Sequence, residues 1–140
     1  MLENLGQVLP FGAKKYGDKT ALVIGSRSFS FNDLNHLSDR LASGLHGLGI
    51  TAGDRVTLYA QNCWEWIVSY YAIARLGAVV NPINVMLTPD EVAYITRDCG
   101  AKVLIGSRDK LAPALEAGVS GLTTVTLGRS LWWGPLPLKS

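Results

Sequence analysis

The chain has 140 residues, of which 48% are hydrophobic and 17% are charged, and its formal net charge at pH 7 is +2. That length favours one domain with a substantial buried core, and the apolar fraction is too high for intrinsic disorder. Thirteen lysines and arginines are scattered along the chain and are balanced by eleven acidic residues. Without a basic stripe or an acidic tail, we expect no nucleic-acid partner and no strongly basic partner.

The lack of a signal-peptide pattern and the setting of the two cysteines both favour a cytoplasmic protein. The first residues lack the charged and apolar regions of a signal peptide. The most apolar stretch, residues 64–87, is interrupted by charged, amide and proline side chains, so we expect no membrane span. Cys63 and Cys99 lie in apolar segments without metal-ligand spacing, which is typical of two buried, reduced thiols. We therefore expect a cytoplasmic protein.

The first fifty residues predict a helix, a hairpin and a second, longer helix. An apolar stripe at helical spacing runs from Leu2 to Phe11. The extended runs 20–24 and 27–31 are joined by Gly25-Ser26, which predicts a hairpin turn. A long amphipathic helix is predicted next, begun by Ser30 or Asn32 and ended by Gly49. Its apolar stripe consists of Leu34, Leu37, Leu41, Leu45 and Leu48.

From residue 50 onward, predicted strands and helices alternate. The expected strands are 55–60, 78–83, 102–105 and 123–127, and the expected helices are 63–76, 88–99 and 109–116. Thr88-Pro89-Asp90-Glu91 has the pattern of a capping box with proline at the first helical position. The helix over 63–76 is apolar nearly all round, so we expect it to be covered on more than one side.

The alternation predicts an α/β fold: an open, doubly wound, mostly parallel sheet with helices on both faces. Residues 1–128 form the expected domain. Residues 129–140 break the pattern, because adjacent tryptophans and alternating prolines fit neither helix nor strand. We expect this tail to be irregular and foreign to the domain.

Taken alone, the residues reveal no catalytic constellation. The glycines of residues 44–49 lack the G-x-G-x-x-G spacing, and no Walker spacing is present. His36 and His46 are ten residues apart on one helix, which places them far from each other around its axis. The aromatic residues of 64–71 favour core packing over a ligand pocket. The sequence therefore predicts an α/β scaffold without catalytic or metal-binding residues.

Five segments in series resemble the adenylate-forming (AMP-binding) superfamily of acyl-CoA synthetases, aryl-CoA ligases, luciferases and peptide-synthetase adenylation domains. They are Phe29–Leu34 with the following helix, Leu48–Ile50 before Gly53-Asp54-Arg55-Val56, Asn62 with Glu65-Trp66, Ala74–Asn84, and Leu87–Glu91. The likeness covers residues 2 to about 127 in family order and spacing, and the Pro-Ile-Asn ending at Asn84 is more like acyl-CoA synthetases. The chain resembles the N-terminal portion of an acyl-CoA synthetase or fatty-acid–CoA ligase, and so the partial N-terminal subdomain of that fold.

The resemblance implies a two-step reaction, in which a carboxylic acid and ATP give an acyl-adenylate that then forms a thioester with CoA. That chemistry requires a Gly/Ser/Thr-rich phosphate loop with lysine, an aromatic-Gly-x-Thr-Glu segment, an aspartate for the ribose and a lysine on a C-terminal domain. None of these is in the sequence. We therefore expect a chain truncated before the phosphate loop and inactive alone, binding no cofactor itself, whereas the full-length family uses ATP, Mg²⁺ and CoA.

The candidate site residues are Asn81, Asn84 and Met86, which follow the C-terminal end of a predicted strand. Open α/β sheets bind ligands at that end, so these residues are expected to face CoA or substrate. In some CoA ligases of the family, an arginine two residues after the equivalent of Asn84 contacts a CoA phosphate. Met86 stands at that position and cannot pair with a phosphate.

Two other functions remain open at this point. A stand-alone α/β binding or interaction module would pair with another chain, or with itself, through an exposed apolar face. An unrelated flavodoxin-like domain would need a phosphate loop after its first parallel strand, where Ala60-Gln61-Asn62-Cys63 offers one helix N-cap. The substrate expected for the full-length family is a small carboxylic acid, whose identity the sequence leaves open.

Overall fold

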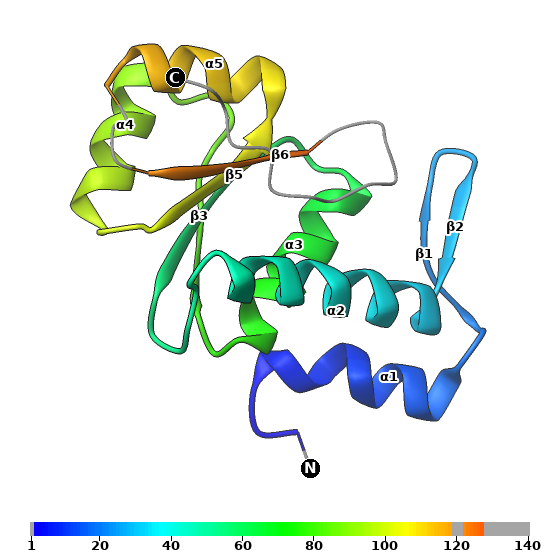
Figure 1. Cartoon of the computed structure of the whole chain (residues 1–140). Coiled ribbons are helices and arrows are strands. Elements are labelled where there is room, and N and C mark those ends of the chain that lie inside the picture. Colours follow the sequence, from blue (N-terminus) through cyan, green and yellow to red (C-terminus); the bar gives the residue numbers. More distant parts are fainter. Residues whose placement is uncertain (1, 119–121, 128–140) are drawn as a thin grey trace.

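A computed structural model of the chain describes residues 2–118 and 122–127 (Figure 1). The elements are η1 (Leu5–Gln7), α1 (Val8–Tyr16), β1 (Thr20–Ile24), β2 (Arg27–Ser30), α2 (Phe31–Gly47), β3 (Arg55–Tyr59), α3 (Trp64–Arg75), β4 (Val79–Pro82), α4 (Pro89–Asp98), β5 (Val103–Ser107), α5 (Arg108–Glu116) and β6 (Thr123–Leu127). The predicted order of helices and strands is confirmed. The predicted irregular tail, residues 129–140, lies outside the described residues.

Four strands form a parallel sheet in the order β4-β3-β5-β6. The strands β1 and β2 form a separate antiparallel hairpin, which stands away from the sheet beside the start of α2 (Figure 1). Gly25 adopts a φ of +59° in the hairpin turn, a conformation that glycine reaches without steric cost. The α/β class and the parallel sheet are therefore as predicted.

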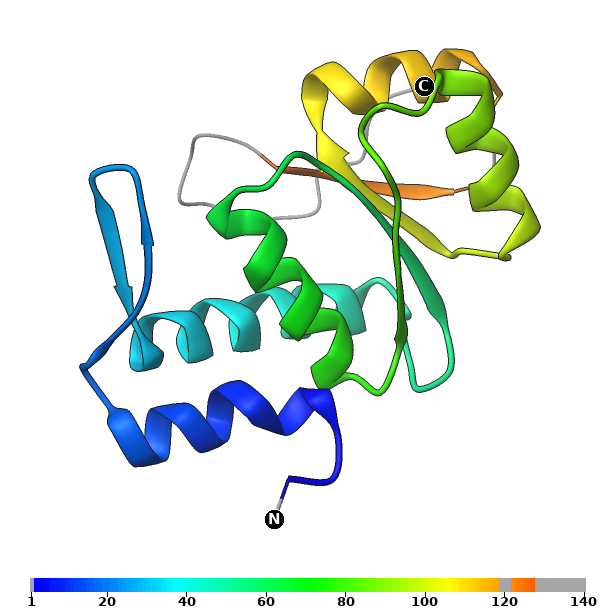
Figure 2. The same cartoon turned by 180° about the vertical axis from the view of Figure 1, so that it is seen from behind.

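The sheet is doubly wound. The connection from β3 to β4 runs along the sheet in one direction, whereas those from β4 to β5 and from β5 to β6 run in the other. Right-handed crossovers then place α3 on one face and both α4 and α5 on the opposite face. Figure 2 shows this arrangement from behind, with α2 packed beside α3 and α1 beyond α2.

Capping boxes begin two of the helices. Ser30 accepts a hydrogen bond from the Asp33 backbone N–H at 3.0 Å, and the Asp33 carboxylate accepts from the Ser30 N–H at 2.8 Å. Ser30, rather than Asn32, is thus the N-cap of α2. Thr88 and Glu91 make the same reciprocal pair at the start of α4, as predicted. These bonds satisfy backbone donors that have no partner inside a helix.

Side chains along the central strands alternate between the two faces of the sheet, so each face has its own core. Val56 and Leu58 of β3 lie in the core beneath α2 and α3, whereas Tyr59 lies in the core beneath α4 and α5. Successive side chains of a strand point to opposite faces, so one buried strand supplies both cores. The helix α3 packs against the sheet, α2 and η1, which confirms that it is covered on more than one side.

The N-terminal stripe and the cysteines differ in burial from the prediction. Of the apolar stripe, Leu9 is buried, whereas Leu2, Leu5 and Phe11 are exposed. The stripe fails as a single face because residues 5–7 form a 3-10 turn before α1 begins at Val8, and the two helix types advance by different angles per residue. Both cysteines are free thiols, but they are half-buried rather than buried.

Candidate functional site

A crevice opens at the carboxyl ends of β3 and β5. These strands are neighbours, but the chain leaves them toward opposite faces of the sheet, through α3 and α5 respectively. Open α/β sheets bind ligands at such a topological switch point, because the two diverging loops leave a gap between them. The crevice has a volume of about 790 Å³ and is lined by Ala60, Gln61, Cys63, Glu65, Ser107, Arg108, Asp109 and Leu127.

A second hollow of about 480 Å³ lies at the carboxyl ends of β3 and β4. It shares Ala60 and Gln61 with the crevice, so the two hollows meet at the loop that follows β3. Its other lining residues are Asn62, Trp66, Pro82, Ile83, Asn84 and Val85. The hollowed carboxyl edge of the sheet is the candidate functional site.

Hydrogen-bond donors dominate the polar side chains of this edge. Gln61 and Asn84 offer amide groups, and Arg108 offers a planar guanidinium that suits phosphate and carboxylate oxygens. Glu65 and Asp109 add two carboxylates beside that arginine. The edge can therefore hydrogen-bond a ligand that carries oxygen acceptors and a donor or cationic group.

Cys63 lies at the N-cap of α3 in the crevice, and its thiol is not activated there. Burial raises the pKa of this thiol to about 11, and the neighbouring Glu65 carboxylate contributes to the rise. A cysteine acts as a nucleophile in its thiolate form, so a raised pKa suppresses that role at neutral pH. The crevice is therefore suited to binding rather than to covalent catalysis by Cys63.

The three residues predicted from the sequence are placed differently by the structure. Asn84 lines the hollow between β3 and β4. Asn81 lies within β4 rather than after it, and its amide donates to Thr57 Oγ1 at 3.2 Å and to Cys99 Sγ at 3.3 Å. Met86 is 84% exposed, and its backbone N–H donates to Asn84 Oδ1 at 2.8 Å.

Sequence reasoning missed the residues of the switch-point crevice. Gln61 follows β3, and Ser107, Arg108 and Asp109 lie at the end of β5 and the start of α5. The first residues of the two strands, Arg55 and Val103, are 48 positions apart in the sequence. The available signal is positional, because Gln61 directly follows the predicted strand 55–60, and Ser107, Arg108 and Asp109 lie within four residues of the end of the predicted strand 102–105.

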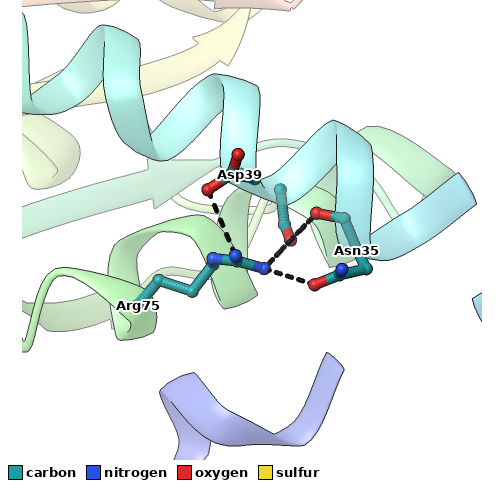
Figure 3. Close-up of polar contacts among 4 residues, drawn as sticks. Asn35, Asp39 and Arg75 are labelled. Atoms are coloured by element: carbon teal, nitrogen blue, oxygen red, sulfur yellow. Dashed lines mark hydrogen bonds and ion pairs between the residues drawn. The ribbon is translucent and has the colours of Figure 1, made fainter. Parts of the chain in front are cut away.

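A hollow of about 770 Å³ also lies between β2 and α2, away from the carboxyl edge. Arg75 of α3 reaches into its lining, but its guanidinium is already bonded (Figure 3). It donates to Asn35 Oδ1 at 2.7 Å and to Ser38 Oγ at 3.1 Å, and it pairs with Asp39 at 3.2 Å. These contacts join α2 to α3, so we interpret this cluster as structural.

The described residues do not fit a metal centre. Among residues 2–118 and 122–127, no group of three or more histidine, cysteine, aspartate or glutamate side chains could hold a metal ion. His36 and His46 are both exposed on α2. We therefore assign no step to Mg²⁺ held by these residues. In the same part of the chain, no helix combines the length and apolar character needed to cross a membrane.

Comparison with known proteins defines the class to which this fold and site belong. Residues 11–132 match the family described as AMP-binding enzymes, and the chain belongs to that family. This confirms the resemblance seen in the sequence motifs. The chain corresponds to the N-terminal part of the adenylate-forming fold, and its relatives include acyl- and aryl-CoA ligases.

Particular relatives are CoA ligases. A crotonobetaine/carnitine–CoA ligase of Salmonella paratyphi A is 40% identical over 110 residues, which are 75% of this chain and 21% of that ligase. The structure of the anthranilate CoA ligase AuaEII with anthranoyl-AMP is 31% identical, with a TM-score of 0.83 over 92% of this chain and 26% of that one. The N-terminal domain of FACL13 from Mycobacterium tuberculosis is 34% identical, with a TM-score of 0.80 over 88% of this chain and 33% of that one.

Proposed function

We propose that this chain forms the N-terminal part of an ATP-dependent ligase that joins a carboxylic acid to CoA. In the first step, a carboxylate oxygen attacks the α-phosphorus of ATP, and pyrophosphate leaves as the acyl-adenylate forms. In the second, the CoA thiol loses its proton and attacks the carbonyl carbon, and AMP leaves as the thioester forms. The observation that carries this proposal is the 40% identity over 110 residues with a CoA ligase.

The contribution proposed for this chain is one wall of the substrate site. Gln61, Asn84 and Arg108 lie at the carboxyl edge of the sheet, where they can donate hydrogen bonds to phosphate or carbonyl oxygens. Such contacts bind and orient a substrate, and orientation alone can lower a reaction barrier substantially. Because ATP and CoA are cytoplasmic substrates, we propose that the ligase works in the cytoplasm on a small carboxylic acid.

The 140-residue chain by itself is proposed to be inactive. Electrostatic stabilisation of charge at the reacting phosphorus is expected to be the largest catalytic contribution. The family segments that supply it are not in this sequence. Purified chain incubated with ATP, Mg²⁺ and carboxylic acids should therefore give no hydroxamate when hydroxylamine is added to trap acyl-adenylate. A hydroxamate that depends on both ATP and the acid would contradict this prediction.

A hybrid ligase tests the function of the matched region. Residues 11–132 of this chain, the range that matches the family model, replace the corresponding segment of the Salmonella ligase, and CoA-thioester formation is measured. The substrates are crotonobetaine, carnitine, anthranilate and a long-chain fatty acid, which are the acids named for the relatives. We expect the hybrid to form a thioester, whereas the ligase with the segment deleted should not. A folded hybrid that forms none with any acid, including those of its host, would contradict the proposal.

A further inference from the structure

Residues 83–87, called segment 83–87 from here on, link β4 to α4 and alternate between half-buried and exposed side chains. Ile83, Val85 and Leu87 pack against the core beneath α4 and α5. Asn84 and Met86, which lie between them, are exposed. The segment is thus anchored by every second side chain, and it displays Asn84 and Met86 at the carboxyl edge of the sheet.

Two side chains from neighbouring elements hold the backbone of this segment. The buried Tyr59 of β3 donates its hydroxyl to the Leu87 carbonyl at 3.3 Å. Lys110 of α5 donates its ammonium to the Val85 carbonyl at 3.3 Å. The two bonds therefore hold the Val85–Met86 and Leu87–Thr88 peptide units, one directly before Met86 and one a residue beyond it.

The two donors also contact each other. Lys110 Nζ lies 6.0 Å from the centre of the Tyr59 ring, within the range of a cation–π interaction. Burial raises the pKa of Tyr59, and the Asp109 carboxylate adds to the rise, so its hydroxyl keeps the proton that it donates. A neutral donor on β3, Tyr59, and a charged donor on α5, Lys110, therefore both hydrogen-bond the backbone of segment 83–87.

We propose that Tyr59 and Lys110 are positioning residues, which hold segment 83–87 so that Asn84 and Met86 face a substrate of the ligase. This inference rests on the proposed function. Packing alone does not require either polar group, because a phenylalanine ring would fill the space of Tyr59 and a methionine would retain much of the apolar stem of Lys110. The hydroxyl and the ammonium act on the backbone of the segment instead.

Hydrogen exchange in the 140-residue chain tests whether the two donors hold the segment. The Met86 and Leu87 N–H groups, bonded to Asn84 Oδ1 and to the Asn84 carbonyl, report its opening. Tyr59→Phe and Lys110→Met should each speed exchange at both amides several-fold. Lys110→Arg, which keeps a charged donor, should leave exchange as slow as in the unmodified chain. The matched control is Lys102→Met, because Lys102 pairs with Asp54 at the amino edge of the sheet. Unchanged exchange in both test variants would overturn the inference.

Kinetics of the hybrid ligase test whether the segment faces a substrate. Tyr59→Phe and Lys110→Met should raise KM for at least one of ATP, CoA and the acid about tenfold while kcat stays within twofold, and Lys110→Arg should recover most of the loss. A purely structural role would lower the amount of active enzyme and hence the apparent kcat instead. If exchange quickens but no KM changes, the inference fails and the proposed function stands. If the folded hybrid is inactive with every acid, the proposed function fails and the inference fails with it.

Discussion

Replacing Arg75 with methionine should lower the free energy of unfolding by about 2–3 kcal/mol, since hydrogen bonds to a charged group contribute about 1.5–3 kcal/mol each. The Arg75 side chain is 17% exposed, and its two shortest bonds go to Asn35 Oδ1 and Ser38 Oγ. The sum of two such bonds is an upper limit. Methionine keeps much of the apolar contact, and Ser38 keeps its own bond to the Asn35 carbonyl at 3.0 Å.

The ion pair with Asp39 should contribute much less than the part-buried bonds to Asn35 and Ser38. The Asp39 side chain is 64% exposed, and exposed pairs contribute about 0.2–1 kcal/mol. Asp39→Asn is therefore the matched control for charge, since it removes the pair but leaves Asn35 and Ser38 bonded. Arg75→Lys should fall between the two, because one ammonium cannot reproduce the planar fork of the guanidinium.

Urea unfolding followed by tryptophan fluorescence measures these differences, provided that the variants share one m-value. The expected order of destabilisation is Arg75→Met, then Arg75→Lys, then Asp39→Asn. A cost below about 1 kcal/mol for Arg75→Met would refute the reasoning, because a typical neutral hydrogen bond already contributes that much. Equal costs for Arg75→Met and Asp39→Asn would show that the exposed ion pair, rather than the part-buried bonds to Asn35 and Ser38, joins α2 to α3.

Three further predictions concern backbone space, helix capping and thiol ionisation. Gly6→Ala should destabilise the fold by about 1–3 kcal/mol, because its Cβ would lie 2.6 Å from the Ala74 carbonyl oxygen. Gly44→Ala on α2, where nothing lies within 4 Å, should stabilise it by about 0.5–1 kcal/mol, and thermal unfolding compares the two. Thr88→Ala should cost about 1 kcal/mol in urea unfolding through loss of the α4 capping box, and an equal cost for the exposed Thr20→Ala would contradict that cause. Burial raises the pKa of Cys63 from 9.0 to about 11, so its contribution to stability is present below pH 9 and is lost as the pH rises through 11. In a Cys99→Ser variant, iodoacetamide should label Cys63 with a midpoint near pH 11, and a midpoint near 9 would contradict the burial of the thiol.

Local patterns allowed the helices and strands to be predicted. The capping box at Thr88 depends on groups within three residues of each other, so its sequence pattern contains the whole interaction. The leucine helix and the alternating strands are set by periodicity over a few turns or residues. The N-terminal stripe was the exception, because a 3-10 turn interrupts its period before α1 begins.

The candidate site depended on which strands become neighbours. Asn84 could be placed near a strand end from the sequence, because the end of a strand is a local property. The crevice between Gln61 and Arg108 could not, because it exists only where β3 lies beside β5 with their connections leaving toward opposite faces. The direction of the Asn81 amide, toward Thr57 and Cys99, likewise depends on partners in other elements.

The sequence by itself determined the order of helices and strands, the α/β class and the family, since each depends on short-range patterns or on motifs read in series. The tertiary structure alone decided the strand order β4-β3-β5-β6, the hollowed carboxyl edge and the contacts of Tyr59 and Lys110 with segment 83–87. The physical reason is the separation in sequence between the residues that interact. Backbone hydrogen bonds in helices and caps join residues a few positions apart, whereas packing across a sheet joins residues separated by tens of positions, whose pairing no local pattern specifies.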